Sequence, residues 1–215
     1  MSIMGLRELK KERTRRTIQE VALRLIKTDG YDSTSVEQIA AAAEVSPATF
    51  YRYYRDKEDV VLAMDSRQVL DAAVKANPSN SPFTSFVQTI FGAIADQHVE
   101  RRDFLLTRYR LIHSVPNLAA RLARQRQTYL HSTFEEFVDH YGLSRDDYEL
   151  RIMFAAVGAI ASDTIDYWAD RKGRPDIRAL LDRAFQQIGP LLQQTDKHVA
   201  SATAHRSTRR VKRPL

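Results

Sequence analysis

Apolar residues recur along this chain at intervals of three and four positions, which is the spacing of amphipathic α-helices. The first such stripe covers residues 18–26, and Gly30 follows it as a residue that favours the end of a helix. No convincing run alternates apolar and polar positions in the way that would indicate a β-strand. The pattern therefore predicts an all-α protein.

Three helix-start signals follow closely in the N-terminal part of the chain. Ser35 can act as an N-cap, and a glutamine three positions later makes a capping box. Ser46 precedes Pro47, and proline favours the first position of a helix. Asp56 is a third N-cap, whose helix is expected to continue to about Val74. These signals predict a three-helix N-terminal unit joined through a fourth helix to the remaining chain.

A turn-rich segment at residues 77–82 separates these helices from a larger helical bundle. Its helices are expected at residues 83–98, 101–113, 117–140, 144–170 and 176–193. Beyond them the chain becomes polar, small and basic, which is typical of a disordered tail. The expected domains are therefore residues 1–58, residues 59–195 and a basic tail over residues 196–215.

The formal net charge of +6 is concentrated in that tail, which carries six Lys and Arg residues and no acid after Asp196. A second basic cluster lies at residues 7–16. Basic ends on a neutral body indicate a polyanionic partner, although a solvated tail that aids solubility explains them equally well.

Composition excludes several classes of function. With no cysteine and 7 glycines, the chain offers no thiolate site and no phosphate-cradling glycine loop. The longest apolar run, residues 152–161, is too short to span a bilayer, and no signal-peptide hydrophobic region is seen. His131 and Glu135 share a helical face, but no second cluster meets them, so no metal site is predicted. We expect a cytoplasmic protein that is not an enzyme and needs no cofactor.

Residues 34–57 contain two short helices separated by three or four residues, which is the geometry of a helix-turn-helix motif. An inward Phe50 would lock the second helix onto the first. The 100° step of a helix then turns a short polar and aromatic set outward, namely Ala48, Thr49, Tyr51, Arg52 and Tyr53. Such a face suits the groove of DNA. Periodicity favours packing among the helices for Tyr54, and for Tyr53 it leaves packing and exposure equally open.

The residues that carry this motif resemble the DNA-binding domain of the tetracycline-repressor (TetR) family of bacterial transcriptional regulators. The match runs from about Thr14 to Leu62 and includes the run Val45-Ser-Pro-Ala-Thr-Phe-Tyr-Arg-Tyr-Tyr54. The resemblance implies DNA contacts from Thr34, Ser35, Val36, Ser46, Pro47, Ala48, Thr49, Tyr51, Arg52, Tyr53 and Lys57. In one departure, Glu44 stands at a turn position that is often glycine in the family, so the turn there is either less tight or strained.

The C-terminal part resembles the TetR subgroup whose effector domains bind acyl-CoA-like ligands, including regulators of the mycofactocin type. The candidate effector residues are aromatic or histidine side chains of the bundle, namely Phe86, Phe91, Phe104, Tyr109, His113, Phe154 and Trp168. Several arginines could bind the phosphates of an acyl-CoA, including Arg102, Arg108 and Arg121. The alternative is that these arginines form an ordinary solvated face.

The expected partners are double-stranded DNA with a palindromic operator, a small-molecule effector and a second copy of the chain. Because one short recognition helix buries little surface, two copies are needed to select a site. We expect the homodimer to form through the last two long helices, around Ile152–Ile160 and Ile177–Leu191. The alternatives are a basic protein that coats DNA without sequence selection and a helical ligand carrier with no role on DNA.

Overall fold

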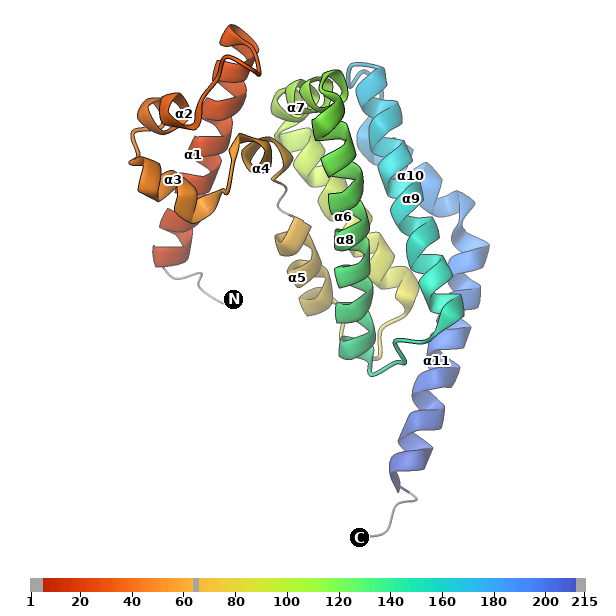
Figure 1. Ribbon diagram of the computed structural model, residues 1–215. Helices are drawn as coiled ribbons and strands as arrows, with labels where there is room; N and C mark the ends of the chain where they lie inside the picture. Colours follow the sequence, from red (N-terminus) through yellow and green to blue (C-terminus); the bar gives the residue numbers. More distant parts are fainter. Residues whose placement is uncertain (1–5, 64–65, 212–215) are drawn as a thin grey trace. The chain divides into compact units, whose positions relative to one another are not determined.

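The computed structural model describes residues 6–63 and 66–211, which form helices and connecting turns and contain no strand. The described helices (Figure 1) are α1 (Leu6–Asp29), α2 (Val36–Ala42), α3 (Pro47–Tyr53), α4 (Lys57–Leu62), α5 (Ser66–Ala76), α6 (Phe83–Glu100), α7 (Arg102–Ser114), α8 (Pro116–Tyr141), α9 (Tyr148–Asp170), α10 (Ile177–Gln187) and α11 (Gly189–Val211). The prediction of an all-α fold is confirmed.

Three of the expected helix boundaries are wrong, one of them at Ile188, where the helix expected over residues 176–193 divides into α10 and α11. The helix expected from Asp56 to about Val74 ends at Leu62, because Ala63 leaves the helical region with ψ 129° and α5 begins at Ser66. The tail expected to be disordered from residue 196 continues as helix through Val211. Val199 is 5% exposed, so this part of α11 carries an apolar side chain that the bundle buries. Residues 212–215 lie outside the described residues.

The chain divides into two compact units. One comprises Met1–Met64 with Asp103–Ala123, and the other comprises Asp65–Arg102 with Arg124–Leu215. This division differs from the boundary expected after residue 58, because most of α7 and the first turns of α8 pack with the N-terminal helices.

The first unit has two neighbouring apolar clusters. Ile18, Ile39, Phe50 and Val60 are fully buried in the cluster that joins α1 to α2, α3 and α4. The second cluster joins α1 and α4 to α7 and α8, through Leu23, Ile26, Val61, Leu62, Ile112, Leu118 and Leu122. Residues 103–123 therefore contribute to the hydrophobic core of the unit that holds α2 and α3.

The second unit is a bundle in which α6 packs against α5, α10 and α11, and α9 packs against α10 and α11. An aromatic group lies in its core, with ring centroids 4.9 Å apart for Phe86 and Phe137 and 5.0 Å apart for Phe137 and Phe154. A Cβ atom at Gly158 of α9 would lie 2.8 Å from Leu130 Cδ1, so glycine allows α9 to approach α8 closely there.

Candidate nucleic-acid interface

The turn between α2 and α3 is fixed by local hydrogen bonds. Ser35 caps α2 and exchanges side-chain and backbone hydrogen bonds with Gln38, as the capping box predicts. Ser46 Oγ accepts a hydrogen bond of 3.0 Å from the Thr49 amide at the start of α3. Glu44 has φ 54°, a left-handed conformation that costs a non-glycine residue about 1–2 kcal/mol. The sequence left open whether this turn is less tight or strained, and the backbone of Glu44 shows that it is strained.

Phe50 anchors α3 to the first unit. Its side chain is completely buried with Ile39 and Ala40 of α2 in the same apolar cluster. Tyr54 is also buried, and its hydroxyl donates to the carbonyl of Arg15 in α1 at 3.1 Å. These contacts hold one side of α3 against the protein and leave its other side for a partner.

The exposed side of α3 carries the side chains that the sequence places there. Tyr51 is 53% exposed, and Arg52 is exposed as well. The Arg52 guanidinium lies 5.3 Å from the ring centroid of Tyr53, which is half-buried. Ser46, Pro47 and Ala48 are exposed at the start of the helix, and Thr49 is half-buried. A guanidinium, a phenol and small side chains on one short helix can reach base edges and phosphates.

Four other candidate residues lie beside α3, and in two of them the side chain donates hydrogen bonds to backbone carbonyls of the protein. The Thr34 side chain is 2% exposed and donates to the Gly30 carbonyl. Lys57 Nζ donates to the carbonyls of Tyr31 and Thr34 at 2.6 Å and 3.1 Å, which ties the start of α4 to the α1–α2 loop. Ser35 and Val36, at the start of α2, are half-buried.

The C-terminal end of α4 is held by two side chains whose role there the sequence does not indicate. Gln19 donates through Nε2 to the carbonyls of Val60 and Ala63, at 3.2 Å and 2.8 Å. Arg108 of α7 donates to the carbonyls of Val61 and Leu62, at 2.6 Å and 3.0 Å. The last carbonyls of a helix have no partner within the helix, and here each receives a buried or half-buried side-chain donor.

The N-terminal end of α4 is held by charge. Arg121 of α8 donates to Asp56 at 3.1 Å and to Asp59 at 2.9 Å, and its guanidinium lies 3.7 Å from Glu58. Arg55 adds a second pair with Asp59, and its hydrogen bond is the main cause that lowers the pKa of Asp59. Burial, followed by a hydrogen bond to Glu58, raises the pKa of Tyr31.

The candidate effector residues are divided between the two units. Phe86 and Phe154 belong to the aromatic core of the second unit, where Phe91 pairs with Phe185 and Trp168 lies edge-on to His98. The other three, Phe104, Tyr109 and His113, belong to the segment that packs in the first unit. Of the arginines considered for phosphate binding, Arg108 and Arg121 hold α4, and Arg102 donates to the carbonyls of Lys172 and Gly173.

The apolar stripes considered for dimerisation differ in exposure. On α10, Ile177 and Leu181 are buried within the chain. On α9, Ile152 is 47% exposed, and Ala155 and Ala159 are exposed. Leu191, at the far end of the second stripe, is 51% exposed, so each stripe presents some apolar surface to solvent. None of the described helices has the length and apolar character needed to cross a membrane.

Two family models match this chain. The model described as "Bacterial regulatory proteins, tetR family" matches residues 18–64, and the "MftR C-terminal domain" matches residues 81–193. The HTH-type transcriptional regulator TcmR of Streptomyces glaucescens is 31% identical over 170 residues, which cover 74% of this chain and 75% of TcmR.

Two solved structures show the same fold. FadR of Thermus thermophilus, a TetR family transcriptional repressor solved with lauroyl-CoA, has a TM-score of 0.52 and 22% identity, covering 80% of this chain and 91% of that chain. NalD of Pseudomonas aeruginosa, the secondary repressor of the MexAB-OprM multidrug efflux pump, has a TM-score of 0.52 and 17% identity. The match covers 86% of this chain and 96% of the NalD chain. The helix-turn-helix geometry, the two family matches and the relative together establish that this chain belongs to the TetR family of bacterial transcriptional regulators.

Proposed function

We propose that this protein is a repressor that binds a palindromic operator as a homodimer and is released by a small-molecule effector of the acyl-CoA type. The observation that carries the proposal is the exposed side of α3, where Tyr51 and Arg52 project from a helix that Phe50 anchors. Two such helices one DNA turn apart would read the two halves of a palindrome.

DNA selection is tested by recovering an operator from a pool of random duplexes and comparing it with a scrambled duplex. Arg52→Ala should lower affinity for the operator about 10- to 100-fold and affinity for the scrambled duplex much less, since a bidentate base contact discriminates by about 1–3 kcal/mol. Arg55→Ala is the matched control. It removes the same charge three residues after Arg52, and the Arg55 guanidinium is bonded to Asp59 within the protein. Equal losses on both duplexes would show that Arg52 contacts only the backbone.

The homodimer is supported by exposed apolar side chains on α9 and α11, including Tyr148, Ile152, Tyr167 and Leu191. Ile152→Arg should produce monomers in sedimentation analysis. Val99→Arg is the control, because Val99 is 59% exposed on α6. A dimer that survives Ile152→Arg would place the interface elsewhere.

The acyl-CoA class of effector is supported by the match to the MftR C-terminal domain and by a fold shared with a repressor solved with lauroyl-CoA. For such an effector to release the operator, it must bind the DNA-free state of the protein more tightly than the DNA-bound state. Titration of the operator complex with lauroyl-CoA, laurate and free CoA tests it. Only lauroyl-CoA should release the DNA, and unchanged operator affinity at saturation would remove this class of effector.

The rival function, a protein that coats DNA without selection, depends on the basic residues at the C-terminal end. Ending the chain after Ala204 removes five of its Lys and Arg residues and keeps the buried Val199. This truncation should reduce the salt dependence of binding to random DNA and leave the preference for the operator unchanged. Loss of that preference would show that the tail itself reads DNA.

A further inference from the structure

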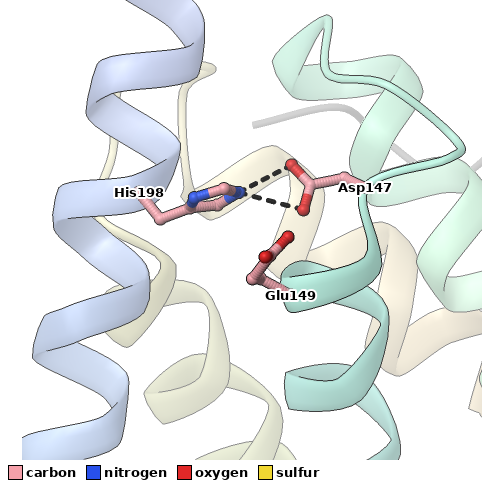
Figure 2. Close-up of side chains that lie close together, drawn as sticks. All are labelled: Asp147, Glu149 and His198. Atoms are coloured by element: carbon pink, nitrogen blue, oxygen red, sulfur yellow. Dashed lines mark hydrogen bonds and ion pairs between the residues drawn. The ribbon is translucent and has the colours of Figure 1, made fainter.

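Three potential metal ligands from two helices of the second unit lie together (Figure 2). Asp147 is the N-cap of α9, Glu149 lies in the first turn of that helix, and His198 lies on α11. One ligand atom from each side chain lies within 4.8 Å of the other two. His198 Nε2 is 2.9 Å from Asp147 Oδ1 and 2.8 Å from Asp147 Oδ2, and the Glu149 carboxylate points toward the same space.

The charges of this cluster do not balance within the protein. The Glu149 side chain has neither a hydrogen bond nor an ion pair with a described residue, although it lies beside a second carboxylate. A protonated His198 supplies at most one positive charge for the two carboxylates. The Asp147 side chain is 10% exposed, so solvent screens its charge only in part. A divalent cation would neutralise both carboxylates at once.

We propose that Asp147, Glu149 and His198 form a binding site for a divalent transition-metal ion, with Zn²⁺ as the best fit. One imidazole nitrogen and two carboxylate oxygens are donors that zinc accepts, and water would complete the coordination. Metal ions that prefer oxygen alone, such as Mg²⁺ and Ca²⁺, gain less from the imidazole. The proposal goes beyond DNA binding and holds whether or not the protein is released by an acyl-CoA.

The site needs only small movements of side chains. Asp147 Oδ1 accepts a hydrogen bond from the Leu150 amide at 3.1 Å and can keep this capping role while Oδ2 binds the metal. Glu149 is exposed and free to rotate toward an ion. His198 Nε2, now directed at Asp147, is the ring nitrogen that would coordinate the ion through its lone pair.

Metal binding at this site would fasten α11 to the start of α9. His198 is adjacent to Val199, which is buried at 5% exposure, so a bond at His198 would stabilise a part of α11 that already packs in the bundle. We expect Zn²⁺ to slow hydrogen exchange of the amides around residues 197–203 and to raise the temperature of unfolding, because a ligand of the folded state stabilises it.

The experiment uses the full chain without a histidine affinity tag, after removal of metal with a chelator. Zn²⁺ is titrated by calorimetry, and Co²⁺ is added to read its visible absorption, which reports nitrogen and oxygen ligands without interference from thiolates because the chain has no cysteine. We expect one ion per chain. His198→Gln and Glu149→Gln should each abolish binding at that stoichiometry and the protection of α11.

His131→Gln is the control variant, because His131 lies four residues before Glu135 on α8 and could itself attract a metal. Glu135 is already bonded to Arg145 at 2.6 Å, so we expect His131→Gln to bind Zn²⁺ as the wild type does. Both site variants should keep their helical content, which circular dichroism checks. Zn²⁺ binding that persists in His198→Gln, or that is absent from the wild type at micromolar concentration, would overturn the proposal.

Discussion

Replacing Arg121 by alanine should loosen α4 within the first unit. The Arg121 guanidinium joins α8 to the first turn of α4, with hydrogen bonds to Asp56 and Asp59 and a charge contact to Glu58. Removing it leaves three carboxylates in four consecutive residues, with Arg55 as the remaining partner of Asp59. The perturbation therefore removes two hydrogen bonds and adds repulsion at one end of a short helix.

The expected cost follows from the exposure of these groups. A hydrogen bond to a charged group contributes about 1.5–3 kcal/mol when well buried, and exposed ion pairs contribute about 0.2–1 kcal/mol. The Arg121 side chain is 23% exposed, and those of Asp56 and Asp59 are 41% and 21% exposed. The pairs thus lie between the two limits, and we expect a total loss of about 2 kcal/mol. This corresponds to a change of about 30-fold in an opening equilibrium.

Hydrogen exchange of the α4 amides measures this opening directly. Arg126→Ala is the matched control, because Arg126 lies on the same helix and makes two hydrogen bonds to Asp166 within the second unit. Arg121→Ala should accelerate exchange in α4 about 30-fold, and Arg126→Ala should leave α4 unchanged. If both variants accelerate α4 equally, or if neither does, the assignment of Arg121 as a clamp on α4 is refuted.

The same interaction predicts how stability depends on pH. The hydrogen bond from Arg55 is the largest cause that lowers the pKa of Asp59 below its ordinary value of 3.8. The charge of Arg121 lowers this pKa further. A carboxylate with a lowered pKa stabilises the folded state above 3.8 and loses this contribution as the pH falls through the folded-state pKa. Arg121→Ala should therefore lose less stability than the wild type over this acidic range. Urea unfolding at a series of pH values tests this difference.

Three further substitutions test the packing, with urea unfolding as the measurement. Phe50→Ala should cost about 3–5 kcal/mol and abolish operator selection, because Phe50 is fully buried beneath α3. Tyr141→Phe should stabilise the protein by about 1 kcal/mol, because the buried hydroxyl has no hydrogen-bond partner among the described residues and burial raises the pKa of Tyr141 to about 12. Glu44→Gly should stabilise by about 0.5 kcal/mol, since relief of the left-handed strain exceeds the added entropy of the unfolded chain.

The local part of the fold could be predicted from sequence because its signals lie within a few residues of one another. Ser35, Ser46 and Asp56 cap α2, α3 and α4 as expected, and each accepts a hydrogen bond from an amide three residues later. Phe50 is buried and Tyr51 is exposed, as the 100° helical step requires. Capping and periodicity are short-range effects, so they remain readable without knowledge of the rest of the chain.

The contacts that hold α4 could not be predicted in this way. Arg108 and Val61 are 47 residues apart, and Arg121 and Asp56 are 65 residues apart. An arginine that binds a distant carbonyl has the same periodic position as one that faces solvent, so the sequence does not distinguish Arg108 and Arg121 from possible phosphate ligands. The end of α4 at Leu62 is not visible in the sequence, because apolar residues continue beyond it. The break at Ala63 depends on its backbone conformation and on these long-range donors.

The position of residues 103–123 in the first unit changes how variants of the candidate effector residues should be interpreted. Phe104 packs against the cluster that contains Val61 and Leu62 of α4, so its replacement can disturb the helix-turn-helix unit directly. A lost response to effector in a Phe104 variant would not distinguish lost ligand contact from a loosened α4. Phe86 and Phe154 pack in the second unit, where α4 has no part. Variants of these two residues that keep full operator affinity but lose the response would isolate the effector site.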